Sequence, residues 1–315
     1  MKAMRFKAFG GLDQLALAEV PPPAPGPGQI LVAVAASSVN PVDWKLRGGL
    51  LRWIVPLRLS PIPCFDFAGE VKALDPQASG FTVGERVFGM LPMTGLGAAA
   101  ECLAVDPAYV TAMPAGLGFQ EAAGLPLAGM TALQALRDQG RLAAGQKVLV
   151  VGAAGGVGHY AVQIAKAMGA RVAGVCGTRN IDPVRSLGAD EVIDYTRDDD
   201  NLPAQPFDLI FDTVMSQPFS RWRPRLAGHG VYVSLLPKPG LWLRSLALPL
   251  YSRQRVRFTV VKPNREDLAW LGGLAQAGQL RTVIDSAHPL AELPAALRKS
   301  QSGRARGKII VQVKP

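Results

Sequence analysis

One stretch limits the fold of this chain more than any other: residues 147–195, in which glycines separate a short apolar strand from a helix. Lys147–Val151 is a β-branched apolar run, as found in strands that are buried on both faces. The sequence GAAGGVG follows at once at residues 152–158, and apolar side chains then recur at helical spacing until Gly169. Arg171–Cys176 is a second apolar strand. The stretch predicts a βαβ unit with glycines in its first turn.

The glycines stand where a dinucleotide would require them. A tight turn needs backbone freedom, and a pyrophosphate needs close approach to N–H groups at a helix N-terminus. A strict G-x-G-x-x-G is not present, because Ala153, Gly155 and Gly158 occupy its three key positions. We still predict dinucleotide binding, since a strand, a helix and a second strand surround the motif in the required order. The residues assigned to the phosphate turn are Ala153, Ala154, Gly155, Gly156, Val157 and Gly158.

The end of the second strand predicts NADP(H) as the cofactor. An NAD site usually places an Asp or Glu there, which binds the ribose 2′-hydroxyl. Here the strand is followed by Gly177, Thr178 and Arg179, and no acidic residue occurs before Asp182. Arg179 could pair with a 2′-phosphate, Thr178 could donate to it, and Gly177 leaves room. A solvated surface arginine is the alternative interpretation.

Composition predicts a soluble globular protein. The chain has 315 residues, of which 49% are hydrophobic and 18% charged, which suffices for two domains with an ample core. The cysteines Cys64, Cys102 and Cys176 are scattered, which disfavours a disulfide framework and fits a reducing, cytoplasmic location. The N-terminus lacks the apolar core of a signal peptide, and no run reaches the roughly 18–20 apolar residues of a membrane span.

The net charge of +10 comes from one segment. Residues 221–265 contain ten Lys and Arg and no Asp or Glu, while the remainder of the chain is balanced. Such a segment could face an anionic cofactor, a membrane surface or nucleic acid, and its plainest interpretation is a solvated basic face near a phosphate site. Its aromatic residues do not follow a single-strand-binding pattern, so nucleic acid is not the expected partner.

Short strands with Gly and Pro between them predict a small β-barrel before residue 120, and helices begin after it. The strands expected there are 4–9, 14–20, 30–39, 67–74, 85–88, 102–105 and 109–113, with a turn at 40–45. Helices are expected at 120–125, 129–138, 218–226, 264–277 (with Asn264 as its cap) and 291–300. The later strands are expected at 209–212, 230–236, 258–261, 283–284 and 308–313.

Taken together, these stretches resemble the medium-chain dehydrogenase/reductase superfamily, and more closely its zinc-free NADPH:quinone oxidoreductase branch, which includes zeta-crystallin-like proteins. The matching segments, in the family's order, are PGPGQILVAV, SSVNPVDWKLRGG, FDFAGEV, FTVGERVFG, EAAGLPLAGMTALQAL, VGAAGGVG, SLGADEVIDY and ARGKIIVQV. Two positions depart from the branch. Met215 stands where a glycine often follows the fourth strand, and Ala99 where relatives commonly have an aromatic residue; both face the substrate in relatives.

The resemblance implies an α/β fold with two domains. A Rossmann domain, a doubly wound parallel sheet that binds NADP(H), would comprise residues 123–263. A GroES-like β-barrel, the catalytic domain, would form from the two ends of the chain, residues 1–122 and 264–315. A homodimer is expected by the same resemblance.

The resemblance also implies contacts with NADPH beyond the phosphate turn. Asn40, Pro41 and Thr131 would hold the nicotinamide ribose and phosphates, and Tyr195 would lie against the adenosine. The remaining residues assigned to the cofactor, at the end of the strand beneath the nicotinamide, are Leu235 and Leu236. Simpler interpretations stay open: Asn40 is a turn former, Thr131 could cap a helix, and Tyr195 could pack at a strand end.

No metal is expected. Catalytic zinc needs three Cys, His or carboxylate ligands and an open position. In the zinc alcohol dehydrogenases of the superfamily the ligands sit near Asn40, Phe65 and Leu127 of this sequence, and none of these side chains can serve. A site using Cys64 and Asp66 would still lack a third protein ligand.

Without a Lewis acid a plain ketone is difficult to polarise, whereas a quinone or an α,β-unsaturated carbonyl compound accepts hydride at an electron-poor carbon. We therefore predict an enzyme that transfers hydride from NADPH to such an acceptor and mainly supplies orientation and a water-poor cleft. The catalytic candidates are Asn40, Asp43, Lys45 and Asp66, and bulk water is an equally good proton donor.

Leu241–Tyr251 (LWLRSLALPLY) is apolar and flanked by basic residues. It could be a lid or wall of the substrate pocket, part of a dimer contact, or a weak peripheral membrane contact. Two other classes of function stay open. One is an NADPH-binding sensor or RNA-binding module without turnover, and the other is a peripheral membrane redox protein that acts on lipophilic quinones.

Overall fold

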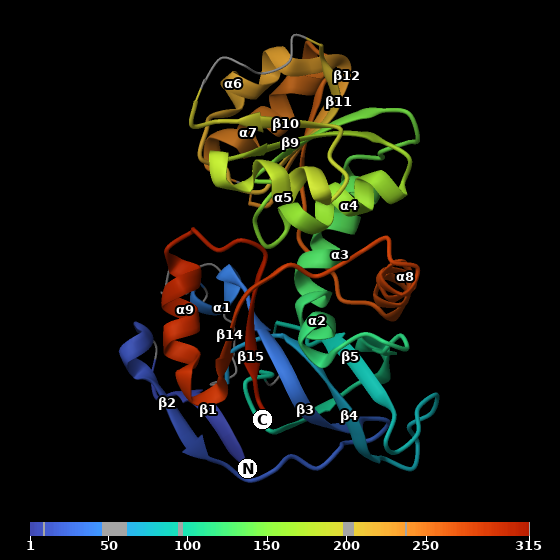
Figure 1. Ribbon diagram of the computed structural model, residues 1–315, viewed down its shortest axis with the longest axis vertical. Helices are drawn as coiled ribbons and strands as arrows, with labels where there is room; N and C mark the ends of the chain where they lie inside the picture. Colours follow the sequence, from blue (N-terminus) through green and yellow to red (C-terminus); the bar gives the residue numbers. More distant parts are fainter. Residues whose placement is uncertain (9, 46–61, 94–96, 198–204, 237, 315) are drawn as a thin grey trace. The chain divides into compact units, whose positions relative to one another are not determined.

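The computed structural model describes residues 1–8, 10–45, 62–93, 97–197, 205–236 and 238–314, and the chain forms two compact units (Figure 1). Unit 1 comprises Met1–Met130 and Lys262–Pro315, and unit 2 comprises Thr131–Val261.

The chain crosses between the units at positions that differ from the expected boundaries. The first crossing follows residue 130 rather than 122, and the second follows residue 261 rather than 263. The first difference arises because the helix α2 (Phe119–Gly124) packs against strands of unit 1. Gly129 also lies against unit 1, so close to Leu271 that an added Cβ would be 3.1 Å from the leucine Cδ1.

Unit 1 is built mainly from antiparallel strands contributed by both ends of the chain. Its seven-stranded sheet has the order β14-β15-β3-β4-β5-β7, with β6 paired to β3, while β1 and β2 form a separate pair. The strands are β1 (Lys2–Phe6), β2 (Leu15–Glu19), β3 (Ile30–Val39), β4 (Asp66–Leu74), β5 (Arg86–Met90), β6 (Cys102–Val105), β7 (Val110–Ala112), β14 (Ile284–Pro289) and β15 (Lys308–Gln312). Because β15 pairs with β3, residues near both ends of the sequence meet in one sheet, as predicted.

The helices of unit 1 are short, and two of them begin with identifiable caps. They are α1 (Pro41–Lys45), α2, α8 (Arg265–Gln276) and α9 (Leu293–Gln301). The expected turn at 40–45 is a one-turn helix instead, because Pro41 favours the first helical position and the carboxylate of Asp43 accepts the N–H of Asn40 at 2.6 Å. The Asn264 cap is confirmed, since its side-chain oxygen accepts the N–H of Asp267 at 2.7 Å.

Unit 2 is a parallel six-stranded sheet in the order β10-β9-β8-β11-β12-β13. Its strands are β8 (Lys147–Val151), β9 (Arg171–Cys176), β10 (Glu191–Asp194), β11 (Phe207–Asp212), β12 (Leu226–Ser234) and β13 (Arg255–Phe258). The helices α4 (Gly158–Ala167) and α5 (Ile181–Ser186) lie on one side of the strands, and α6 (Phe219–Trp222) and α7 (Pro239–Ala247) on the other (Figure 1). The predicted doubly wound α/β fold is therefore confirmed.

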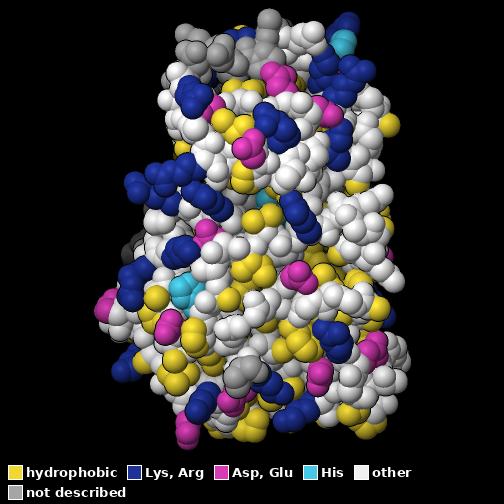
Figure 2. Space-filling view, in the orientation of Figure 1, with side chains coloured by type: hydrophobic (Ala, Val, Ile, Leu, Met, Phe, Trp, Pro, Cys, Tyr) yellow, Lys and Arg dark blue, Asp and Glu magenta, His cyan; other side chains and the backbone are white. Residues whose placement is uncertain are grey.

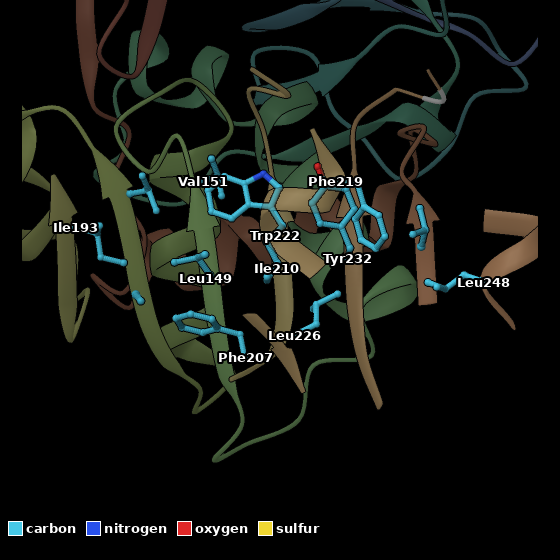
Figure 3. Packing of buried hydrophobic residues seen from close by; sticks show 13 residues of the cluster. Leu149, Val151, Ile193, Phe207, Ile210, Phe219, Trp222, Leu226, Tyr232 and Leu248 are labelled. Carbon is cyan, nitrogen blue, oxygen red and sulfur yellow. The ribbon is translucent and has the colours of Figure 1, made fainter. Parts of the chain in front are cut away.

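The face of this sheet beneath α6 and α7 is packed with large apolar side chains. Figure 3 shows Phe219 and Trp222 of α6 above Leu149, Ile210 and Tyr232 of the strands. The rings of Phe219 and Tyr232 meet edge to face at 5.1 Å between centroids, which is a favoured aromatic geometry. Burial of these rings fixes α6 on the face of the sheet. The turns that follow the carboxyl ends of the strands are not part of this packing.

Two sequence expectations in unit 2 were wrong or incomplete. The last strand is Arg255–Phe258 rather than 258–261: Val256 is buried opposite Tyr232, whereas Val260 is exposed, so the β-branched run after Phe258 was misleading. Leu241–Tyr251 folds as the greater part of α7 and a 3₁₀ turn at Leu248–Leu250. Within the described residues, no helix is long and apolar enough to cross a membrane.

Candidate functional site

Five buried polar side chains gather where β3 ends and β4 begins. We call them the Asp66 cluster: Ser38, Asn40, Asp43, Asp66 and Lys308. The antiparallel register explains how they meet, because Ser38 lies opposite Asp66 and the start of β15 lies beside the end of β3. Three strands and α1 thus bring together residues that are far apart in the sequence.

Asp66 is the centre of this cluster. Its Oδ2 accepts hydrogen bonds from the Ser38 hydroxyl at 2.6 Å and the Asn40 amide at 2.7 Å, and its Oδ1 accepts the N–H of Leu127 at 2.8 Å. The ammonium of Lys308 lies 3.7 Å from Oδ2 and donates to Asn40 Oδ1 at 2.6 Å. Burial raises the pKa of Asp66, but Lys308 and these hydrogen bonds oppose the rise. Since only an ionised carboxylate can accept all these donors, Asp66 is negatively charged.

Asp43 is a second buried carboxyl group, with a different environment. Its Oδ2 accepts the Asn40 N–H, whereas its Oδ1 makes no hydrogen bond of ordinary geometry to the described residues. Burial raises the pKa of Asp43 to about 7; Asp66 adds repulsion, while the backbone N–H of Asn40 and the charge of Lys308 act against the rise. At neutral pH this group therefore holds a proton about half of the time.

Lys45, the fourth catalytic residue predicted from the sequence, does not join the cluster. It is exposed at the end of α1, with its ammonium 5.4 Å from the centroid of the Trp44 ring. Pro41 is also exposed. Thr131 is buried in the interior of α3 (Pro126–Gln134), so it is not that helix's N-cap. Asn40, Asp43 and Asp66 are brought together, and Lys45 is not.

Two members of the cluster were missed from the sequence, Ser38 and Lys308. Lys308 precedes the apolar run Ile309–Val311, and a lysine at the start of a strand normally lies in solvent. Lys308 is buried because β15 pairs with β3. The residues around Lys308 in the sequence do not indicate this pairing.

In unit 2, the glycine turn joins β8 to α4 and requires glycine at two positions. Gly152 has φ of +80°, in the left-handed region, and an added Cβ would lie 2.3 Å from Cγ2 of Val214. At Gly158 an added Cβ would lie 2.0 Å from the carbonyl oxygen of Gly152. Any larger residue at Gly158 would push α4 away from the turn.

The same turn presents free donors at the start of a helix. Within the described residues, the N–H groups of Ala154, Gly156 and Val157 make no hydrogen bond. They lie at the N-terminal end of α4, where aligned peptide dipoles favour an anion. The turn follows β8, beside β11, where the strand order of the sheet reverses, and ligands of such sheets bind there. These residues fit a pyrophosphate.

A second set of residues gathers at the carboxyl ends of β9 and β10. The Thr178 hydroxyl lies 2.6 Å from Asp194 Oδ2 and 2.7 Å from the Thr196 hydroxyl. Tyr195 is exposed, and its hydroxyl would lie 3.6 Å from a Cβ placed on Gly177. Tyr195 is therefore available as a flat surface beside Gly177 and is not packed into the strand end.

Asp194 was missed because it belongs to the neighbouring strand. No acid follows β9 in the sequence, yet Asp194 at the end of β10 reaches the turn after β9. Hydrogen bonds from Thr178 and Thr196 lower the pKa of Asp194, and Arg197 lies 3.6 Å from it. Its carboxylate is thus already engaged, while Arg179 is exposed in the adjacent turn.

The two departures from the family pattern differ in kind. Met215 has φ of +57°, which explains why glycine is common there; its N–H donates to Asp212 Oδ1 at 2.7 Å, which helps to hold the unfavourable conformation. Ala99 is completely buried.

Leu235 and Leu236, which the sequence assigned to the cofactor, follow β12, and Leu236 is exposed.

The side chains at the three positions equivalent to zinc ligands do not fit a catalytic zinc. Phe65 and Leu127 are buried hydrocarbons, and the side-chain oxygen of Asn40 accepts the ammonium of Lys308. In the described ranges, no three or more His, Cys, Asp or Glu side chains form a group that could hold a metal ion.

Comparison with known proteins gives consistent similarities across the chain. The family described as alcohol dehydrogenase GroES-like domain matches residues 26–178, and the family described as zinc-binding dehydrogenase matches residues 187–311. The chain is 37% identical to the chloroplast envelope quinone oxidoreductase homolog of Arabidopsis thaliana, over 99% of this chain and 98% of that protein. It is 36% identical to a trans-enoyl reductase of Aspergillus terreus, over 91% of this chain and 87% of that protein. The structure of the quinone oxidoreductase from Coxiella burnetii superposes with a TM-score of 0.89 at 32% identity, covering 100% of this chain and 99% of that one.

Gly158→Ala should lower the free energy of unfolding by about 1–3 kcal/mol, because its Cβ would collide with a backbone oxygen that cannot move independently. Gly155→Ala is the matched control: its Cβ would be 3.3 Å from the same Gly152 oxygen, and the loss should stay below about 1 kcal/mol. Urea unfolding without nucleotide measures both. Equal losses would contradict the assigned role of Gly158.

The free energy of unfolding should fall by about 2 kcal/mol between pH 5 and pH 7, as Asp43 ionises in the native state. The unfolded carboxyl loses its proton near its ordinary pKa of 3.8, whereas the buried one keeps it to about pH 7. The native state therefore binds the extra proton below pH 7, and this stabilisation is lost as the pH rises through 7.

Urea unfolding at several pH values checks this dependence, with Asp43→Asn as the test and the exposed Asp13→Asn as the control. Asp66 and Lys308 are present in all three proteins, so the difference isolates Asp43. Asp43→Asn should flatten the profile and Asp13→Asn should not. An unchanged profile in Asp43→Asn would show that Asp43 is ionised throughout.

Proposed function

Since the chain belongs to the medium-chain dehydrogenase/reductase superfamily and groups with its quinone oxidoreductases, we propose that it transfers hydride from NADPH to a quinone or an α,β-unsaturated carbonyl compound. The observation that carries the proposal is the glycine turn, with its free N–H groups at the strand-order reversal of a parallel sheet. The names of relatives supply the acceptor class: a quinone oxidoreductase homolog and a trans-enoyl reductase.

NADPH rather than NADH is supported by the charges around Thr178. Arg179 is exposed in the turn after β9, where a 2′-phosphate would lie, and the side chains of Tyr195 and Thr196 lie beside Gly177. The acidic residue that reaches this turn, Asp194, already accepts hydrogen bonds from two threonine hydroxyls and lies beside Arg197. It is thus less available to bind a ribose hydroxyl.

The acceptor must be activated on its own, because the Asp66 cluster offers no site for a metal ion that could polarise a carbonyl group. When bound, the nicotinamide would supply the hydride. A quinone or enone takes it at an electron-poor carbon, and the product then needs a proton on oxygen or carbon. The chain's own contribution is to bind and orient both reactants and to provide that proton.

Among the candidate side chains, Asp43 is best suited to hold the proton. Its pKa of about 7 keeps it partly protonated at neutral pH. Asp66 accepts three hydrogen bonds and pairs with the ammonium of Lys308 at 3.7 Å, and Lys45 is exposed to solvent, which could itself supply the proton. Asn40 acts as a positioning residue, because it bonds to Asp43, Asp66 and Lys308 at once.

The proposal includes a homodimer in the cytoplasm. The cysteines Cys64, Cys102 and Cys176 are unpaired, which fits a reducing compartment. Among the described residues, no strand pairs with the outer edge of β13, and we assign this edge to a second copy.

The decisive experiment titrates the protein with NADPH and NADH and then adds paired acceptors while the nicotinamide absorbance is followed. Cyclohexenone and a benzoquinone should be reduced, whereas cyclohexanone, which lacks the conjugated double bond, should not. Binding of NADPH without turnover of any conjugated acceptor would favour a nucleotide sensor. Failure to bind either nucleotide would refute the assignment of the glycine turn.

Arg179→Ala should weaken NADPH binding about ten-fold or more and leave NADH binding nearly unchanged, since only NADPH carries the 2′-phosphate. Arg171→Ala is the matched control, because Arg171 is exposed at the opposite end of the same strand, β9. Fluorescence titration with both nucleotides measures the four affinities. Equal weakening for NADPH and NADH would assign the 2′-phosphate to another residue.

A further inference from the structure

Helix α7 is apolar on the face that points outward as well as on the face that packs inward. Leu241 and Leu248 contact the core of unit 2. We call the outward residues the α7 surface: Trp242 (49% exposed), Leu243 (60%), Leu246 (57%), Leu250 (86%) and Tyr251 (66%). Trp242 and Leu246 are four residues apart and so lie on one face of the helix, and Leu250 follows in the 3₁₀ turn. An exposed apolar face of this size on a helix is normally covered.

The stretch of sequence that contains α7 carries positive charge only. Between residues 221 and 261, all within unit 2, the sequence has eight Lys and Arg and no Asp or Glu: Arg221, Arg223, Arg225, Lys238, Arg244, Arg253, Arg255 and Arg257. Figure 2 shows Lys and Arg side chains gathered at the end of unit 2 where Figure 1 labels β12. Arg244 belongs to α7 and Arg223 lies beside Tyr251, so a partner that covers the α7 surface should be anionic.

An open depression of about 490 Å³ lies beside α7, and two of these arginines line it. It is lined by Arg223 and Arg244, together with Ser220, Pro224, Leu226 and Gln254. Arg223 is held in place, because its Nε donates to Gln254 Oε1 at 3.4 Å and its guanidinium lies 5.6 Å from the centroid of the Tyr251 ring. Arg244 belongs to α7 itself, so the depression adjoins the α7 surface.

We propose that the α7 surface docks unit 2 on a bilayer that contains anionic phospholipid. Trp242, Leu246 and Leu250 enter the boundary between headgroups and acyl chains, and Arg223 and Arg244 bind a lipid phosphate in the adjacent depression. This combination of a large apolar surface and a basic rim is what interfacial helices use.

Charge favours a bilayer over the other partners that could cover this surface. A second copy placed on the α7 surface itself, as distinct from one paired along the edge of β13, would bring two sets of Arg223 and Arg244 together, and like charges at an interface oppose association. Nucleic acid would meet the charge but would leave the exposed leucines without a contact. An anionic bilayer satisfies both the apolar side chains and the arginines.

The test is flotation of the intact protein with vesicles of phosphatidylcholine alone and of phosphatidylcholine mixed with phosphatidylglycerol, at near-physiological ionic strength. We expect the protein to float with the mixed vesicles and to stay behind with the neutral ones. High salt should weaken binding without abolishing it, because the apolar contribution is not screened. Absence of flotation with the mixed vesicles, or equal flotation with both, would overturn the proposal.

Two pairs of variants separate the apolar and the charged contributions. Trp242→Ala/Leu246→Ser and Arg223→Ala/Arg244→Ala should each reduce partition to the mixed vesicles about ten-fold or more. The controls remove similar groups from unit 1: Trp270→Ala, which is 40% exposed, and Arg5→Ala/Lys72→Ala. An unchanged thermal midpoint shows that each variant is folded.

Controls that lose as much binding as the test variants would refute a specific docking surface. Light scattering gives a further decisive outcome. If the protein is a dimer that Leu246→Glu dissociates, the α7 surface is a contact between copies and the bilayer proposal fails.

Discussion

The buried charge of Asp66 is the constraint on which unit 1 depends. A carboxylate without water must be matched by donors, and here they come from β3, the residue after β3, the start of α3 and β15. Removing any one partner would leave the others facing an incompletely compensated charge. The cluster therefore fixes how three strands and the entrance to α3 meet, while it also holds Asp43 away from water, and this burial raises its pKa.

In unit 2, the glycine turn presents backbone N–H groups to a charged ligand. No charged side chain is needed in that turn. The approach of Gly158 to the Gly152 oxygen closes the turn, and the closed turn leaves three N–H groups unpaired at the start of α4. Selectivity is assigned to a second place, the turn after β9, where side chains can vary without disturbing the first. Binding of the pyrophosphate is thus assigned to the turn after β8, and selection of the cofactor to the ends of β9 and β10.

Local patterns were sufficient for most of the fold. Strands such as Ile30–Val39 and Arg171–Cys176 were predicted with their observed ends, because continuous apolar runs bounded by turn residues are hard to misinterpret. The sequence did not predict the position of a side chain where an adjacent strand in the sheet determines it. Lys308 is buried by the strand that pairs with it, and Asp194 reaches a turn that belongs to another strand. A single strand's pattern contains neither fact, so both residues were visible only once the sheets were assembled.

The path of the chain imposes an order on its synthesis. Unit 2 is one continuous segment, residues 131–261, and can close its parallel sheet as soon as that segment has left the ribosome. Unit 1 must wait, because β6 covers only the Ile30–Ala33 end of β3 on one side, and the Ala36–Val39 end has no neighbour on that side until β15 has been made. During that interval Asp66 lacks its ammonium partner and the half-built sheet exposes apolar residues and an unpaired edge. For a nascent chain, this is the period in which chaperones are most needed and premature association is most probable.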